Sequence, residues 1–280
     1  MLELEKKIPL KEIPFAAFDL ETTGIDPLSD EIIEVGIAVF KQEKLIKKFD
    51  QLVNPRVPIS KEAFQVHGIH EDLLRNHPFI EEILPEIFSI LRESVPVAHN
   101  APFDFSFLLE AGRKNNLAMP CNIVVDSCLL AKKLFPTLPN HRLGFLIETF
   151  GLKSQQAHRA LSDAESCWAL FCLEVEKLPL KWDTPIGDFL TSVSGVLSFD
   201  GTPFPFPDKL LPFKQFFVNH EKLSFSYRDG KGEITKREVT PMGFTRDGDK
   251  TMLVGYCHLR KGTRTFRLDR ILELEPIRTS

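Results

Sequence analysis

A segment rich in proline and phenylalanine divides the chain into two parts. Between positions 179 and 217 the sequence has six prolines and seven phenylalanines. A solvated tether would be rich in glycine and serine, so these phenylalanines are expected to pack onto the neighbouring parts and limit their motion. We therefore predict a domain over residues 1–178, a linker over residues 179–217 and a second domain over residues 218–280.

The two predicted domains have different sequence patterns. Before residue 178, strand patterns such as Phe15–Leu20 and Val95–Ala98 alternate with helical patterns such as Phe79–Leu91, which is typical of an α/β domain. After residue 220, short β-like runs are separated by turn sequences such as DGKG and RDGD. Turns of this kind predict a small antiparallel barrel or sheet.

Composition excludes several classes of protein. Hydrophobic residues make up 43% of the 280 positions, enough to bury a core. The longest uninterrupted apolar run, Cys167–Leu173, is far shorter than the roughly 18 residues that a membrane helix needs. The first residues lack the apolar stretch of a secretory signal, so we expect a cytoplasmic protein with no membrane association. The five cysteines form no CxxC pair and predict neither a zinc site nor a disulfide framework.

Charge is distributed unevenly along the chain. Residues 1–182 hold 20 basic and 26 acidic residues, a balance of −6, and residues 183–280 hold 15 and 13, a balance of +2. An acidic domain is a poor electrostatic match for a polyanion unless its carboxylates hold cations.

Five residues in the first domain suggest a metal-dependent site. Asp19 and Glu21 stand two positions apart on a buried strand, so both side chains project from one face, where they repel each other unless a cation compensates. Asp104 follows the end of another strand, where α/β sheets tend to assemble sites. His158 and Asp163 are five residues apart, about 140° around a helix, so His158 is expected on a loop before the helix that carries Asp163.

These residues lie in FDLETTG, HNAPFD and HRALSDAE, which in order and spacing resemble the motifs of the DEDDh exonucleases, the group of the DNA polymerase III epsilon subunit, RNase T and oligoribonuclease. EAFQVHGI and VVDSCLLA also match, and the resemblance covers roughly residues 13–178. It implies an RNase H-like fold with a mixed sheet flanked by helices. It also implies 3′–5′ exonuclease activity with two divalent metal ions, Mg²⁺ or Mn²⁺.

The resemblance also assigns roles to individual positions. It implies that the metals are bound by Asp19, Glu21, Asp104 and Asp163. It makes His158 the general base. The positions that it implies for contact with the substrate are Leu20, Thr22, Thr23, Glu62, His67, Asn100 and Phe103. This residue set suits Mg²⁺, which prefers carboxylate and water oxygens, and a histidine can accept the proton of an attacking water near neutral pH.

The C-terminal sequences SFSYRDGKGEITKREVTPMGF, LVGYC and RTFRLDRI resemble a WYL domain, an SH3-like β-barrel, over about residues 220–275. The tripeptide that names these domains is replaced here by Met252–Val254. The resemblance implies binding of nucleic acid or a nucleotide-like ligand. Its candidate ligand contacts are Tyr227, Arg228, Tyr256, Arg264, Arg267 and Arg270.

Several functions remain compatible with the sequence. The leading one is a 3′–5′ exonuclease that acts on nucleic acid, with single-stranded DNA ends as the expected substrate. An alternative is a catalytically silent nucleic-acid-binding regulator, although all four acids and the histidine are present. Another is an RNA-directed exonuclease whose WYL domain docks a replication or repair protein. The motifs are shared by DNA and RNA enzymes, so they leave the choice between these polymers open.

Overall fold

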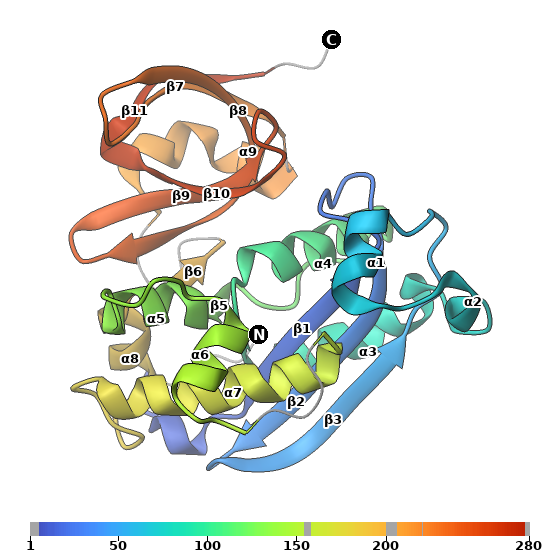
Figure 1. Cartoon of the computed structure of the whole chain (residues 1–280). Coiled ribbons are helices and arrows are strands. Elements are labelled where there is room, and N and C mark those ends of the chain that lie inside the picture. Colours follow the sequence, from blue (N-terminus) through green and yellow to red (C-terminus); the bar gives the residue numbers. More distant parts are fainter. Residues whose placement is uncertain (1–5, 154–157, 200–205, 220, 278–280) are drawn as a thin grey trace.

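The computed structural model describes residues 6–153, 158–199, 206–219 and 221–277. A mixed sheet forms the centre of the N-terminal region, which we call the α/β part (residues 6–178; Figure 1). Its strands are β1 (Phe15–Thr22), β2 (Ile32–Lys41), β3 (Lys44–Leu52), β4 (Val95–Ala98) and β5 (Ile123–Asp126). Their order is β3-β2-β1-β4-β5, with β1, β4 and β5 parallel and β2 and β3 antiparallel to their neighbours. The expected mixed sheet is confirmed.

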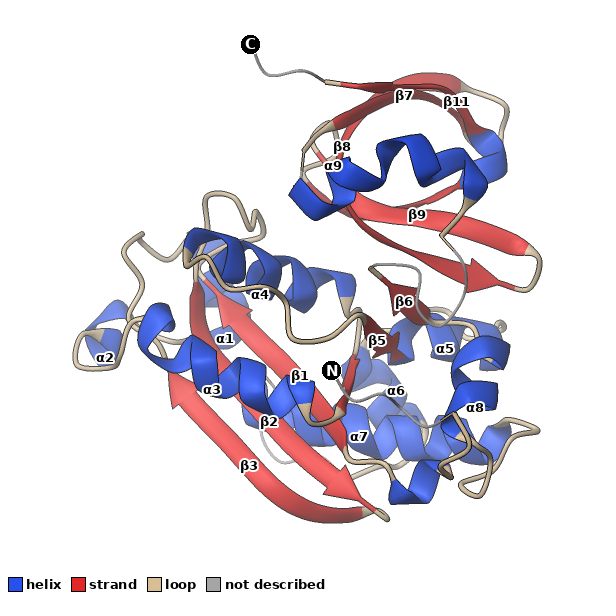
Figure 2. Cartoon of the chain, turned by 180° about the vertical axis from the view of Figure 1, so that it is seen from behind, coloured by secondary structure: helices blue, strands red, loops and turns tan. Residues whose placement is uncertain are grey.

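Helices cover both faces of this sheet. Helices α3 (Ile80–Arg92) and α4 (Pro102–Lys114) lie over one face, and α7 (Ala160–Lys177) lies over β1 and β2 on the other (Figures 1 and 2). The α7 backbone approaches so closely that a Cβ atom on Gly36 of β2 would lie 2.1 Å from the backbone of Ala160. Glycine at this position therefore allows the start of α7 to rest directly on the sheet.

Shorter helices complete the α/β part. They are η1 (Leu10–Glu12), α1 (Lys61–His67), α2 (Glu71–Leu74), α5 (Ser127–Leu134) and α6 (Leu143–Thr149). Helices α1 and α2 project beyond the end of the sheet (Figure 1). None of the described helices combines the length and the apolar composition that crossing a bilayer requires.

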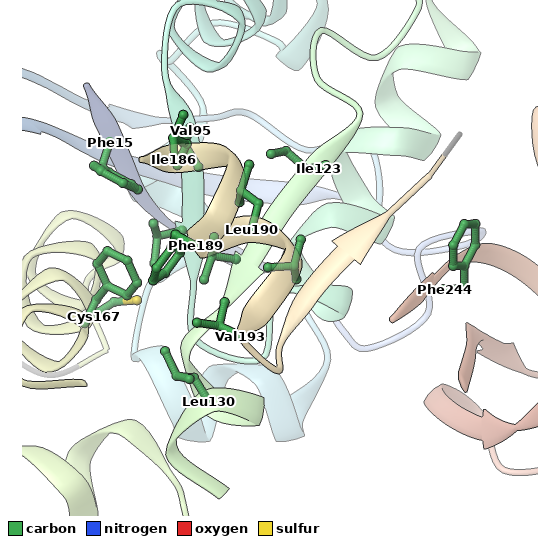
Figure 3. Packing of buried hydrophobic residues seen from close by; sticks show 14 of the residues in the cluster. Phe15, Val95, Ile123, Leu130, Cys167, Ile186, Phe189, Leu190, Val193 and Phe244 are labelled. Carbon is green, nitrogen blue, oxygen red and sulfur yellow. The ribbon is translucent and has the colours of Figure 1, made fainter. Parts of the chain in front are cut away.

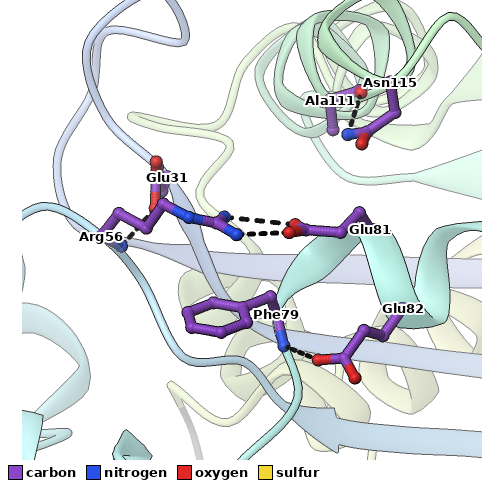
Figure 4. Close-up of polar contacts among 7 residues, drawn as sticks. All are labelled: Glu31, Arg56, Phe79, Glu81, Glu82, Ala111 and Asn115. Carbon is purple, nitrogen blue, oxygen red and sulfur yellow. Dashed lines mark hydrogen bonds and ion pairs between the residues drawn. The ribbon is translucent and has the colours of Figure 1, made fainter.

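Polar contacts fasten the start of β2 to the start of α3 (Figure 4). The Arg56 guanidinium forms an ion pair with Glu81, and the Arg56 backbone N–H donates to the Glu31 carboxylate at 2.6 Å. The Glu82 carboxylate accepts from the backbone N–H of Phe79 at 2.7 Å, which caps α3. These contacts hold two segments together that are far apart in the sequence.

The segment between residues 179 and 217 contains regular structure. It forms α8 (Ile186–Ser192), β6 (Val196–Ser198), η2 (Asp208–Phe213) and the beginning of α9 (Lys214–Asn219). Phe189 of α8 is buried in a core that also includes Phe15 of β1 and Phe244 (Figure 3). Strand β6 pairs with β5 on one side and with β8 (Ile234–Asp247) on the other, so a single sheet continues from the α/β part into the C-terminal region.

The C-terminal region, which we call the β part (residues 221–277), is an antiparallel sheet that curls on itself (Figure 1). Its elements are β7 (Leu223–Arg228), β8 (Ile234–Asp247), β9 (Lys250–Cys257), β10 (Gly262–Arg267), η3 (Leu268–Arg270) and β11 (Ile271–Pro276). The pairing order is β11-β7-β8-β9-β10, and α9 packs against β8. The antiparallel sheet agrees with the expectation, and assignment to the SH3-like class stays a prediction.

Candidate active site

Strand β1 places two acids at the centre of the α/β part. Asp19 lies opposite Gly36 of β2, and Glu21 lies opposite Glu34, so the side chains of Asp19 and Glu21 share one face of the sheet. This is the face on which α7 rests, because the start of α7 contacts the sheet at Gly36.

Two helices bring the other acids to the same place. Asp104 is buried in the first turn of α4, where its Oδ1 accepts from the backbone N–H of Leu20 at 3.0 Å. Asp163 stands in the first turn of α7. The charges of Asp104, Glu21 and Asp163 all act on Asp19, so the structure brings the four sequence-predicted acids together.

Burial makes ionisation of this cluster costly. Burial, followed by the charge of Asp163, raises the pKa of Glu21 to about 8, and burial raises the pKa of Asp104 to about 8. The pKa of Asp19 is raised well above its ordinary value, first by burial and then by the other three acids. None of the four forms an ion pair with lysine or arginine within the described residues. A bound divalent cation would offset this repulsion, so the residues fit a metal site.

His158 lies on the loop before α7, as the helix geometry predicted. Its backbone has a φ of 60°, in the left-handed region, and its N–H donates to Asp163 Oδ2 at 2.9 Å. Possible ligand atoms of Glu21, His158 and Asp163 all lie within 4.8 Å of one another, as in a metal-binding group. The exposed histidine ring is thus adjacent to two of the acids.

The predicted substrate contacts divide into buried and exposed groups. Thr23 is fully buried, and its hydroxyl donates to Asp30 Oδ1 at 3.1 Å, while the Thr22 hydroxyl donates to the Gly24 carbonyl at 2.6 Å. His67 is also buried, and its Nδ1 accepts from the backbone of Ile69. Burial lowers the pKa of His67. Glu62, by contrast, is exposed on α1.

Three further predicted contacts lie beside Asp104. The Leu20 side chain is buried in the core while its backbone N–H binds Asp104, and the Phe103 ring lies half-buried 5.2 Å from Phe107. Asn100 is exposed, with a left-handed backbone at a φ of 68°. Their contact with substrate stays a prediction.

Sequence reasoning missed two buried acids that support the site. Asp126 Oδ1 accepts from the backbone N–H groups of Asn100, Cys128 and Leu129, so it caps α5 and fixes the loop that leads to Asp104. Glu34 of β2 is fully buried and forms an ion pair with Arg159. In both VVD and IIEVG a single acid interrupts an otherwise apolar strand pattern, and this pattern could have identified Asp126 and Glu34.

The six candidate residues of the β part occupy different environments. Tyr256 is only 3% exposed; its phenol hydrogen-bonds the Asp26 side chain, and burial raises its pKa. Base stacking needs an exposed ring face, which Tyr256 does not offer in this structure. Tyr227 packs edge-on against Phe266, and its hydroxyl accepts from the backbone of Arg267 at 3.3 Å.

The arginines of this set also differ from one another. Arg267 forms an ion pair with Asp269. Arg228 and Arg264 are exposed, and Arg270 is half-buried near the turn that contains Gly230. Their role in ligand binding stays a prediction.

Arg237 of β8, which sequence reasoning missed, is the buried cation of the β part. It is 9% exposed, and its Nε and one terminal nitrogen are buried with no hydrogen-bond partner. The hydroxyl of Thr235, two positions away on the same face of β8, is buried and unpaired as well. Arginine cannot lose its proton to escape this cost.

Family models match both parts of the chain. Residues 16–171 match the RNase T model, described as exonuclease, and residues 208–276 match the WYL domain. PolC-type DNA polymerase III of Caldanaerobacter subterraneus subsp. tengcongensis is 39% identical over 164 residues, 59% of this chain. The corresponding protein of Bacillus subtilis is 34% identical over 158 residues, 56% of this chain. The chain spans only 12% and 11% of the length of these relatives.

Solved structures match over different extents. A structure of exonuclease X in complex with 5′ overhanging duplex DNA is 26% identical with a TM-score of 0.50, covering 61% of this chain and 97% of that one. A structure of the Escherichia coli ExoI–ssDNA complex is 18% identical with a TM-score of 0.57, covering 87% of this chain and 54% of that one. This second likeness concerns the fold alone, and it extends well beyond residues 16–171.

Proposed function

We propose that this chain, which belongs to the RNase T exonuclease family and carries a WYL domain, is a metal-dependent 3′–5′ exonuclease. One observation carries this function. Four acids from three distant segments converge at one point, largely buried and without a paired lysine or arginine among the described residues, and a histidine stands beside them. Such an arrangement is costly for stability unless divalent cations bind it.

Two Mg²⁺ or Mn²⁺ ions would be held by Asp19, Glu21, Asp104 and Asp163. When bound, such ions stabilise the charge that develops on the attacking and leaving oxygens during phosphodiester hydrolysis. The donor set consists of carboxylate oxygens, which suits these hard cations better than zinc.

His158 would accept the proton of the attacking water. Its ring is exposed and adjacent to Glu21 and Asp163, so it can reach a water that approaches these acids. Asp163 accepts the His158 backbone N–H, which couples the position of the base to that of the acid.

We propose single-stranded 3′ ends of DNA as the substrate. The relatives named above at 39% and 34% identity are DNA polymerases, and exonuclease X was solved in complex with 5′ overhanging duplex DNA. Glu21 and Asp104 are less than 10% exposed, so we expect the phosphate of a single-stranded end to reach them more readily than that of a base-paired end. The exposed positions Glu62 and Asn100 are available to contact the terminal nucleotide.

For the β part we propose binding of nucleic acid or a nucleotide-like ligand. Arg237 supports this function because a guanidinium with two buried, unpaired nitrogens favours an anionic partner. Arg264 lies on an exposed part of β10 and adds a second positive charge to this part of the molecule.

The activity is tested with end-labelled single-stranded DNA and RNA in the presence of Mg²⁺, Mn²⁺ or EDTA. We expect shortening from the 3′ end of DNA only when a divalent ion is present, and turnover by His158→Ala lowered by roughly 10²–10⁴-fold. If His158→Ala were as active as the wild-type chain, His158 would not be the general base. Absence of cleavage by the wild-type chain would favour a catalytically silent binding protein. Faster cleavage of RNA than of DNA would indicate RNA as the substrate.

A further inference from the structure

Glu34 is a fully buried acid next to the carboxylate cluster, and both of its side-chain oxygens accept hydrogen bonds. It lies opposite Glu21 in the pairing of β1 and β2, so the two side chains share a face. Glu34 Oε1 accepts from the Arg159 guanidinium, at 2.8 Å from Nε and 2.6 Å from a terminal nitrogen. Glu34 Oε2 accepts from the backbone N–H of Ala160 at 3.0 Å. Both Glu34 oxygens therefore contact the two residues that follow His158.

The two residues that Glu34 holds directly follow His158. The His158 backbone is in the left-handed region, which a residue with a side chain adopts only when its surroundings impose it. On its C-terminal side the contacts of Arg159 and Ala160 with Glu34 fix the chain. The bond from His158 N–H to Asp163 closes this short loop onto the first turn of α7.

Building on the exonuclease activity proposed above, we infer that Glu34 and Arg159 form a positioning pair that sets the orientation of His158. The arginine also neutralises Glu34, which would otherwise add a fifth negative charge beside the four acids. Neither residue needs to touch the substrate, because a displacement of about 1 Å at a reacting group can cost about 10²-fold in rate.

Glu34→Gln tests this role with little change in size. A glutamine has one acceptor oxygen where glutamate has two, so the variant can keep the contact with Arg159 or with Ala160 but not both. We expect kcat to fall by about 10–100-fold, while KM for the strand, the melting temperature and Mn²⁺ affinity measured by calorimetry change little. Glu81→Gln is the matched control, since it disrupts an exposed Arg–Glu ion pair, the one with Arg56, and should leave kcat unchanged.

A double-mutant cycle separates a pair from two independent residues. Arg159→Gln should lower kcat to a similar extent, and Glu34→Gln combined with Arg159→Gln should lose little more than either single variant. The imidazole resonance of His158 in ¹H–¹³C NMR spectra of the metal-free protein should shift in all three variants and stay in place in Glu81→Gln.

The outcomes distinguish this role from failure of the proposed activity. An unchanged His158 resonance in Glu34→Gln would overturn the positioning role, and so would unchanged kcat or a loss of kcat that follows a loss of folded protein. If the wild-type chain has no nuclease activity, the proposed function fails, and the NMR spectra still decide whether Glu34 and Arg159 position His158.

Discussion

The α/β part and the β part place their charged residues in opposite ways. In the α/β part, acids from β1, α4 and α7 meet at one largely buried point and have no cationic partner among the described residues. In the β part, cations such as Arg264 are exposed, Arg267 is paired with Asp269, and Arg237 is buried with two unpaired nitrogens. Unpaired buried charge is the feature that distinguishes a site from a solvated surface, and it is concentrated in the α/β part.

Removing one acid should produce the largest effect. Asp104→Asn keeps an oxygen for the backbone N–H of Leu20 but loses the charge, so we expect turnover to fall by at least ~10³-fold with the fold retained. The measurement is the cleavage rate of a labelled strand in Mg²⁺, together with a circular dichroism spectrum. Glu110→Gln on the same helix, whose side chain pairs with Arg113, should keep full activity. Comparable rates for the two variants would contradict the assignment of Asp104.

The same acids should make the metal-free protein sensitive to pH. The pKa values of Glu21 and Asp104 are raised to about 8, above their unfolded values of 4.5 and 3.8, so the folded state binds more protons than the unfolded state between these limits. The contribution of these two groups to the stability of the metal-free protein is therefore greatest below about pH 4, and it declines as the pH rises to about 8.

We expect the melting temperature in EDTA to fall by ~10 °C between pH 5.5 and pH 8, and Mn²⁺ to restore most of it at pH 8. Differential scanning calorimetry measures both. The Asp104→Asn variant should show a smaller fall. A melting temperature that does not depend on pH in EDTA would mean that burial and repulsion of these acids do not destabilise the metal-free protein.

The β part should respond more weakly. Arg237→Gln removes the buried cation and should weaken binding of a single strand by about 10-fold, corresponding to about 1.4 kcal/mol. Lys236→Gln removes an exposed positive charge from the neighbouring position and serves as the control. Fluorescence anisotropy with a labelled oligonucleotide and EDTA-treated protein compares them. Equal weakening by both would mean that only total charge matters and that Arg237 forms no specific site.

The sequence predicted the parts of the molecule that local patterns determine. The strand of Asp19 and Glu21 and the loop position of His158 were available from spacing and periodicity, and the mixed sheet was expected from the resemblance to the DEDDh exonucleases. The hydrogen bonds of Glu34 with residues 159 and 160 join positions more than 120 residues apart, and no local pattern specifies such a contact.

The burial of Tyr256 in the β part could not be predicted from the sequence either. Tyr256 is covered because it meets Asp26 of the α/β part, and a pattern of alternating residues cannot show that another part of the chain lies over one face. The pairing of β6 with two partners was also missed, since three residues are too short to give a periodic signal.

Strand β6 has a consequence for the order in which the chain can fold during synthesis. Until residues 196–198 leave the ribosome, the outer edge of β5 has no partner strand. Strand β6 in turn has an unpaired edge until Phe244 and Thr245 of β8 have been made. A nascent or truncated chain that ends between these points presents an open strand edge, which is prone to pair with other chains. Completion of the continuous sheet therefore depends on residues made nearly 50 positions after β6, so the two parts are expected to mature as one unit rather than in succession.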